Sequence, residues 1–212
     1  MQTKKSQSTI TPEKALEMLK EGNSRFVQNK KEDKDLLQQV SYACKGQYPF
    51  ATILSCIDSR VPAEIVFDQG IGDIFSIRIA GNIINEDILG SMEYACKVAG
   101  SKLIVVLGHS NCGAVKGACD RVELGNLTGL LEKILPTVKE VSRTQGEGLS
   151  VSTSEFVQHV AEQNVLRTIG QISNQSSILR EMIADKKIDI AGGMYDVNSG
   201  MVTFFNSTEV TV

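Results

Sequence analysis

The chain has 212 residues and a mass of 23.0 kDa, which fits a single domain over residues 1–212. Hydrophobic residues make up 42% and charged residues 22% of the chain, which excludes a disordered protein, and no apolar stretch approaches the roughly 20 residues of a membrane helix. The 22 basic and 25 acidic side chains give a net charge of −3, so no surplus of cations is present to neutralise phosphates. We therefore expect neither a nucleic acid nor a membrane as partner.

The cysteines and the N-terminal residues favour a reducing compartment. A chain of this size does not need disulfides, and an odd number of cysteines indicates ligands, nucleophiles or core packing. The five cysteines are Cys44, Cys56, Cys96, Cys112 and Cys119, and the two histidines are His109 and His159. Residues 1–10 are polar and lack the apolar segment of a secretory signal. We therefore expect a cytoplasmic protein.

The first 45 residues are predicted as a polar tail, over residues 1–10, followed by an N-terminal helical arm over 11–45. Thr11 is a good helix cap, Pro12 fits the first helical position, and Glu13 places an acid in the first turn. An apolar face follows at helical spacing, which predicts that this arm packs on the rest of the domain.

Three nearly unbroken apolar runs follow, at residues 50–56, 74–80 and 103–107. Runs of this length without polar alternation predict strands that are buried on both faces of a sheet. Between the second and third runs, Asp87 is predicted to cap a helix that ends at Gly100.

The remainder of the chain predicts helices and two closing strands. The pattern is mostly helical from Gly113 to residue 141, and a loop is expected at 146–150. Ser154 is predicted to cap one helix, and residues 178–183 to form another. The closing strands are expected at 188–191 and 201–205, joined through 195–200. Strands that alternate with helices predict an α/β fold with a mainly parallel central sheet flanked by helices.

Two of the buried runs end on side chains that bind metals. Cys56 closes the first run, and His109 and Cys112 follow the third. Because ligands bind beyond the carboxyl ends of parallel strands, we expect the three side chains to converge at one edge of the sheet. Two thiolates and one imidazole suit Zn²⁺, and a site with three protein ligands leaves a fourth position for water, as catalytic zinc sites do.

Asp58 and Arg60 lie in the irregular segment directly after Cys56. An arginine fork can hold a carboxylate through two hydrogen bonds. Held in this way, Asp58 stays ionised and can accept the proton of a zinc-bound hydroxide. Released from Arg60, Asp58 can take the fourth zinc position in a closed state, with loss of activity.

The other notable polar residues have simpler explanations. Cys44, Cys96 and Cys119 are predicted to be packing residues, because free cysteines are often buried. His159 is predicted to lie on an amphipathic helix as an ordinary surface or core residue. Arg78 interrupts an apolar strand and needs a partner if it is buried, but the sequence indicates none.

Two motifs resemble those of the beta-class carbonic anhydrases: Cys56-Ile-Asp-Ser-Arg-Val61, with Pro62 and Glu64 behind it, and Gly108-His-Ser-Asn-Cys-Gly113. Residues 72–82 are similar to that family as well, and the likeness runs from about Phe26 to Phe205. The resemblance implies an enzyme that hydrates CO2 reversibly to bicarbonate and a proton by a zinc-bound hydroxide. It implies one Zn²⁺ per chain on Cys56, His109 and Cys112, with Asp58 and Arg60 as the catalytic pair.

The resemblance also implies the substrate site and the assembly. Gln47 matches the family's substrate-binding glutamine, and Phe75 and Tyr94 match aromatic residues that line a small CO2 pocket completed across a dimer interface. Homodimers or homotetramers are therefore expected. Two alternatives stay open: a carbon disulfide or carbonyl sulfide hydrolase with the same zinc site, and a non-catalytic zinc or bicarbonate-binding module. The presence of Asp58 and Arg60 argues against the non-catalytic module, because a structural site does not need an open position on the metal.

Overall fold

The computed structural model describes residues 2–145 and 153–205, so that the loop predicted at 146–150 lies outside the described residues. The strands are β1 (Ala51–Ser55), β2 (Ile74–Arg78), β3 (Leu103–His109), β4 (Asp189–Tyr195) and β5 (Val202–Phe204). The described α-helices are α1 (Lys4–Thr9), α2 (Pro12–Val27), α3 (Leu36–Ala43), α4 (Ala63–Val66), α5 (Glu86–Glu93), α6 (Gly113–Cys119), α7 (Gly125–Leu131), α8 (Leu135–Gln145), α9 (Ser154–Gln175) and α10 (Ser177–Ala184). Two short helical turns are η1 (Ala80–Asn82) and η2 (Tyr94–Val98). None of the described helices combines enough length with enough hydrophobicity to span a lipid bilayer.

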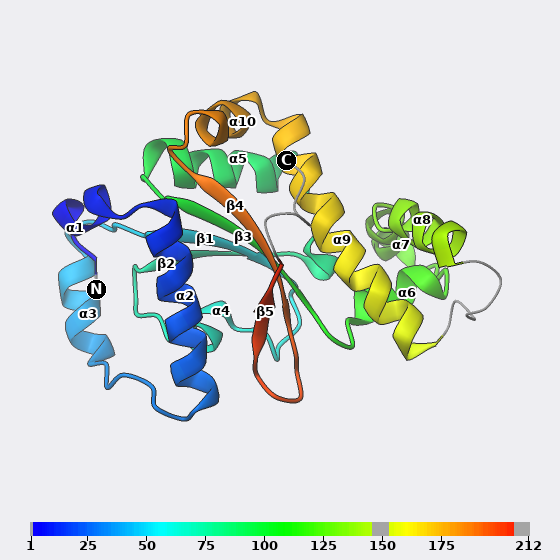
Figure 1. Cartoon of the computed structure of the whole chain (residues 1–212), viewed down its shortest axis with the longest axis horizontal. Coiled ribbons are helices and arrows are strands. Elements are labelled where there is room, and N and C mark those ends of the chain that lie inside the picture. The colour runs from blue at the N-terminus through cyan, green and yellow to red at the C-terminus, as the bar shows by residue number, and fades with distance from the viewer. Residues whose placement is uncertain (1, 146–152, 206–212) are drawn as a thin grey trace.

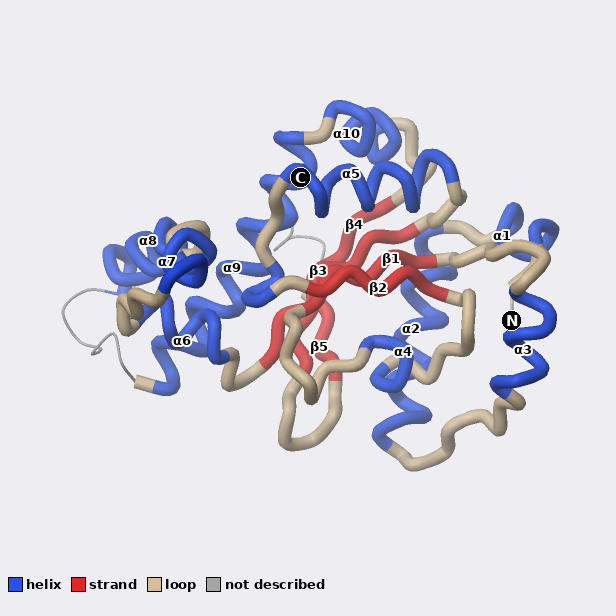
Figure 2. Tube along the Cα trace, turned by 180° about the vertical axis from the view of Figure 1, so that it is seen from behind, coloured by secondary structure: helices blue, strands red, loops and turns tan. Residues whose placement is uncertain are grey.

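The strands form one sheet in the order β2-β1-β3-β4-β5. Strands β1 to β4 are parallel, and β5 runs antiparallel to β4. Figures 1 and 2 show α5 and α10 on one side of the sheet and α2 and α4 on the other, with α6, α7 and α8 grouped beyond α9. The predicted α/β fold with a mainly parallel sheet flanked by helices is confirmed.

The central strands are apolar throughout because both of their faces are covered. Ile53 on β1 and Val105 on β3 pack with α2 and α4. Their neighbours Leu54 and Val106 pack in a second cluster with α5, α6, α8, α9 and α10. Every residue of β1 and β3 is buried, which explains why these runs lack the polar alternation of a half-exposed strand.

Strand β2 differs from its prediction as a fully buried strand. Only Ile74 is buried, whereas Phe75 and Ile77 are half-buried and Ser76 and Arg78 are exposed. The reason is its place in the sheet: β2 pairs only with β1 and is an edge strand in the described sheet. The apolar run from Ile74 to Ala80 could not distinguish an edge strand from a central one.

The N-terminal prediction is also corrected. Residues 1–10 were predicted only as a polar tail, whereas the structure forms α1 there, with Thr3 and Ser6 in a capping box. Gln7 of this helix is buried and donates hydrogen bonds to the backbone carbonyls of Pro49 (2.7 Å) and Ala99 (2.8 Å). These bonds anchor α1 to the start of the sheet.

Two helix caps are corrected as well, and one helical region proves to be three helices. The cap of α5 is Asn85 and not Asp87, and that of α9 is Thr153, with Ser154 as the first helical residue. The region from Gly113 to residue 141 is divided among α6, α7 and α8. Each cap is a short polar residue whose side chain accepts a hydrogen bond from a backbone N–H of the first turn. The sequence therefore predicts the type of capping residue, but it misplaces the cap by one or two residues.

The order of the strands indicates where a ligand site should lie. From β1 the chain passes through α4 to β2 on one side, and then through α5 to β3 on the other side. Helices α4 and α5 pack in different core clusters, on opposite faces of the sheet. In open parallel sheets, ligands bind beyond the carboxyl ends of the strands at this reversal, which here means the ends of β1 and β3.

Candidate metal centre

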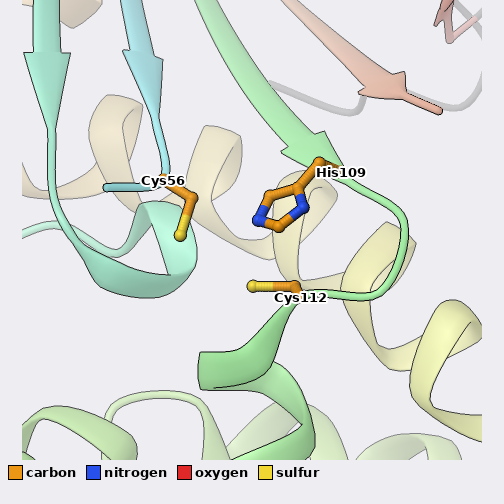
Figure 3. Close-up of side chains that lie close together, drawn as sticks. All are labelled: Cys56, His109 and Cys112. Carbon is orange, nitrogen blue, oxygen red and sulfur yellow. The ribbon is translucent and has the colours of Figure 1, made fainter. Parts of the chain in front are cut away.

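Three side chains that bind metals meet at this reversal. Cys56 directly follows β1, His109 is the last residue of β3, and Cys112 precedes the first residue of α6. Their ligand atoms all lie within 4.8 Å of one another, and Figure 3 shows the thiols and the imidazole directed toward one another. Cys56 is 4% exposed, His109 0% and Cys112 1%. The predicted convergence is confirmed.

The backbone around these residues is adapted to bring them together. A Cβ atom at Gly108 would lie 2.5 Å from Met194 Sδ and 2.7 Å from Val165 Cγ2, so only glycine lets β3 approach β4 and α9 just before His109. Asn111 has a left-handed φ of 54°, which asparagine tolerates better than most residues. This turn directs the chain back so that Cys112 faces His109.

The imidazole of His109 is oriented by its own loop. Its Nδ1 lies 2.9 Å from the carbonyl oxygen of Ser110, and a carbonyl can only accept, so Nδ1 carries the proton. The other nitrogen, Nε2, is buried and has no hydrogen-bond partner among the described residues. A buried nitrogen lone pair without a partner is costly in a folded protein, whereas a metal ion would satisfy it.

The two thiols influence each other's protonation. A hydrogen bond with Cys112 lowers the pKa of Cys56, and the ring of His109 and the backbone N–H of Gly81 act in the same direction. The Cys56 thiolate and burial raise the pKa of Cys112. A divalent cation would hold both as thiolates, because its charge stabilises the second negative charge. Two soft thiolates and an imidazole therefore fit Zn²⁺.

Asp58 and Arg60 form the predicted bidentate pair. Arg60 Nε donates to Asp58 Oδ1 at 2.9 Å, and Arg60 Nη2 donates to Oδ2 at 2.7 Å. The Arg60 guanidinium lowers the pKa of Asp58 well below its ordinary value, so the carboxylate is ionised at neutral pH. Asp58 Oδ2 lies 3.9 Å from His109 Nε2. An oriented negative charge therefore lies beside the group formed by Cys56, His109 and Cys112, here called the metal-type cluster.

The sequence did not indicate what holds this pair in place. Arg60 Nη2 also donates to the carbonyl of Asn111 at 3.2 Å. Arg78, whose partner the sequence did not reveal, donates from Nε to the carbonyl of Cys56 at 3.1 Å and from Nη2 to that of Asp58 at 2.6 Å. Arg78 is exposed as a whole and binds backbone rather than a carboxylate, so no local sequence signal could have identified its partners.

The three residues matched to substrate binding lie in more open surroundings. The rings of Phe75 and Tyr94 meet edge to face, with centroids 6.4 Å apart, and both line an open hollow of about 650 Å³ along β2 and α5. None of the described residues lining this hollow belongs to the metal-type cluster. Gln47 lies exposed in the loop between α3 and β1. Within one chain, Phe75 and Tyr94 therefore lie together, but the hollow that they line does not include the metal-type cluster.

The other cysteines and the second histidine have separate surroundings. Cys96 and Cys119 are packing residues as predicted, and burial raises their pKa values to about 12 and about 11. Cys44 is exposed, so its prediction as a packing residue is wrong. His159 lies on α9 with a side chain that is 36% exposed, 3.8 Å from Glu162. It is a surface residue.

Two cysteines and one histidine form a buried cluster at the switch point of a parallel sheet, and an oriented carboxylate lies beside them. This arrangement is typical of a metal-dependent enzyme. Comparison with known proteins defines the family. The model of the carbonic anhydrase family matches residues 51–202. Over 198 residues the chain is 41% identical to carbonic anhydrase 2 of Mycobacterium tuberculosis, and the match covers 89% of this chain and 90% of that protein.

Solved structures agree. The β-carbonic anhydrase CafA of Aspergillus fumigatus superimposes with a TM-score of 0.73 at 27% identity, covering 91% of this chain and 89% of that one. A tetrameric β-carbonic anhydrase of Sordaria macrospora gives a TM-score of 0.69 at 26% identity, with 79% and 85% covered. The chain belongs to the beta-class carbonic anhydrase family.

Proposed function

We propose that this carbonic anhydrase binds one Zn²⁺ per chain on Cys56, His109 and Cys112 and interconverts CO2 with bicarbonate and a proton. The observation that carries the proposal is the buried Nε2 of His109, which has no hydrogen-bond partner in the part of the chain that the structure describes. It lies 3.9 Å from an ionised Asp58, and its ring forms one cluster with two cysteine thiols. A purely structural zinc site has four protein ligands, and the cluster among the described residues supplies three.

Asp58 is the residue to which we assign the handling of the nucleophile's proton. Bound zinc would supply a Lewis acid that lowers the pKa of water toward neutrality. The water would lose one proton to solvent before it attacks, and the Asp58 carboxylate would accept a hydrogen bond from the remaining O–H, which directs an oxygen lone pair toward CO2 so that attack gives bicarbonate. Arg60 donates to both carboxylate oxygens and so keeps Asp58 ionised and prevents it from becoming a ligand. If this pair opened, Asp58 would be free to act as a fourth ligand in a closed state.

Gln47, Phe75 and Tyr94 are the residues to which we assign substrate binding. The amide of Gln47 can donate to a CO2 oxygen as negative charge develops there. Phe75 and Tyr94 form an apolar wall that suits a nonpolar gas. Because Tyr94 is 51% exposed and lies beside an edge strand, this wall excludes water only when something covers it.

A second copy of the chain is the cover that we propose, in a homodimer or homotetramer. Helix α3 has no buried residue, and its Leu37 is 82% and Tyr42 58% exposed. Val98, one turn of η2 beyond Tyr94, is 71% exposed. Exposed apolar side chains favour association, and the Sordaria macrospora relative is tetrameric. The thiolate ligands favour a reducing cytoplasm.

Stopped-flow measurement of CO2 hydration tests the proposal. We expect rapid hydration by the wild type and a loss of about 10²–10⁴-fold in Asp58→Asn, with zinc retained in both proteins. Asp120→Asn is the matched control, because it removes a carboxylate paired with Lys116 on the surface and should hydrate CO2 normally. A wild type that binds zinc without hydrating CO2 would support a non-catalytic module, and faster turnover of carbonyl sulfide or carbon disulfide would support the hydrolase alternative.

A further inference from the structure

Ser110 lies between the ligands His109 and Cys112 and is held by the hairpin that joins β4 to β5. Its backbone N–H donates to the carbonyl of Tyr195 at 2.9 Å. Its hydroxyl donates to Asp196 Oδ1 at 3.2 Å and accepts from the backbone N–H of Val197 at 3.0 Å. A residue in the loop between two ligands is thereby fixed at three points by a segment that is 85 or more residues away in sequence.

Asp196 is itself immobilised. Its Oδ1 accepts from the backbone and side-chain nitrogens of Asn198, both at 3.0 Å, and its Oδ2 accepts from the hydroxyl of Ser199 at 2.8 Å. These bonds, that from the Asn198 backbone first, lower the pKa of Asp196 to about 2. The carboxylate is therefore a fixed, charged acceptor for the Ser110 hydroxyl at neutral pH.

The chain of contacts ends at the metal-type cluster. The carbonyl of Ser110 accepts the proton of His109 Nδ1 at 2.9 Å, and that bond leaves Nε2 bare and directed at the thiols. Histidine ligands are generally oriented by such a partner on their second nitrogen, and losing it costs about 10–100-fold in metal affinity. Here the orienting group is a backbone carbonyl, whose position depends on what holds Ser110.

We propose that Ser110 and Asp196 are positioning residues of the metal centre: through the Ser110 carbonyl they fix the tautomer and ring orientation of His109. The proposal rests on the proposed function, because it concerns affinity for the metal on which that function depends. Neither residue touches substrate, and neither is expected to exchange protons during turnover.

Zinc affinity, measured by competition with a chelator, tests the proposal. Ser110→Ala removes the hydroxyl and should weaken zinc binding by about 10–100-fold. Ser110→Thr keeps a hydroxyl and should restore affinity to within about threefold of the wild type. The matched control is Ser199→Ala, which removes a bond to the other oxygen of the same carboxylate. It loosens the hairpin without touching Ser110 and should leave zinc affinity within the same range.

A spectroscopic measurement separates positioning from general loosening. The visible absorption of the Co²⁺-substituted protein should change in Ser110→Ala and in Asp196→Asn, and should match the wild type in Ser199→Ala. Asp196→Asn also serves if Ser110→Ala does not fold. Because the pair acts as a unit, the double variant should bind zinc no more weakly than the weaker single variant.

Two results would overturn the proposal: unchanged zinc affinity in Ser110→Ala and Asp196→Asn, or an equal loss in Ser199→Ala. A wild type that binds neither zinc nor Co²⁺ would instead refute the proposed function. Failure of the two proposals can therefore be distinguished.

Discussion

The metal-type cluster and the candidate substrate residues have contrasting surroundings in the same chain. Cys56, His109 and Cys112 are at most 4% exposed, and the backbone N–H of Gly81 and the carbonyl of Ser110 form hydrogen bonds with Cys56 and His109. Tyr94 is 51% exposed, and Gln47 lies in an exposed loop. On the function proposed above, metal binding would depend on one folded chain alone, whereas a dry pocket for CO2 would need the surface of a second copy. Each prediction below separates these two regions.

The largest effect is expected for a ligand of the cluster. Cys112→Ser should lose stoichiometric zinc and nearly all CO2 hydration, because serine is a hard and poorly ionised donor. Cys119→Ser is the matched control, since Cys119 is a buried cysteine on the next turns of the same helix. It should keep its zinc. Zinc per folded chain and stopped-flow hydration measure both variants, and retention of metal and activity in Cys112→Ser would refute the ligand assignment.

The next effect tests whether the substrate residues act across an interface. Gln47→Ala should lose about 10²–10³-fold in activity, as removal of one donor to a developing oxyanion does. If Gln47 of one chain serves the metal centre of its partner, coexpression with Cys112→Ser should restore about a quarter of the wild-type activity. Random pairing makes half of the dimers mixed, and each mixed dimer has one complete site, which combines the intact ligands of one chain with the intact Gln47 of the other.

The control for this experiment pairs two defects of the metal region. Coexpressed Asp58→Asn and Cys112→Ser should show no restoration, because each chain needs its own Asp58 and its own ligands. Restoration in this control, or none with Gln47→Ala, would contradict the division between the two regions.

The smallest effect on activity is expected at an ion cluster whose residues belong to neither region. Asp68 is buried and binds Arg25 (2.6 Å) and Lys34. Burial alone would raise its pKa, but the bonds from Lys34 and Arg25 outweigh burial and lower it. Asp68→Asn should destabilise the fold by about 2–3 kcal/mol, less than for a fully buried pair because Arg25 is partly exposed, and leave zinc content unchanged. Asparagine tolerates the left-handed φ of 48° at this position.

The pH dependence follows from the direction of this shift. The pKa of the Asp68 carboxyl is lower in the folded state than its ordinary value of 3.8 in the unfolded state. Such a carboxylate stabilises the fold at a pH above 3.8, and this stabilisation is lost as the pH falls through the pKa of the folded state. The difference in unfolding free energy between wild type and Asp68→Asn should therefore be full at pH 7 and shrink below about pH 4. Glu17→Ala, which breaks an exposed pair with Lys14, should change stability by less than about 0.5 kcal/mol at either pH. A pH-independent difference for Asp68→Asn would contradict the assigned cause.

The structural features that depend on residues close together in the chain could be predicted from the sequence. Buried strands have unbroken apolar runs, so β1 and β3 and the residues at their ends could be located, and with them Cys56, His109 and Cys112. The spacing of Asp58 and Arg60 was enough to predict their pairing, because both lie in one short segment.

Properties that depend on the order of the strands could not be predicted. The run at β2 resembles that at β1, and only the sheet order makes β2 an edge strand. Arg78 bonds to carbonyls 20 and 22 residues away, and Ser110 bonds to Asp196 over 86 residues. Neither contact has a local signal, and α1 was missed because its short polar sequence is stabilised by capping and by the buried Gln7 rather than by an apolar face.

Metal analysis of the purified wild-type protein tests the central claim most directly. We expect about one zinc ion per chain, bound by the two cysteines and the histidine at the ends of β1 and β3. A protein that is fully folded after purification in the presence of zinc and yet contains none would contradict it.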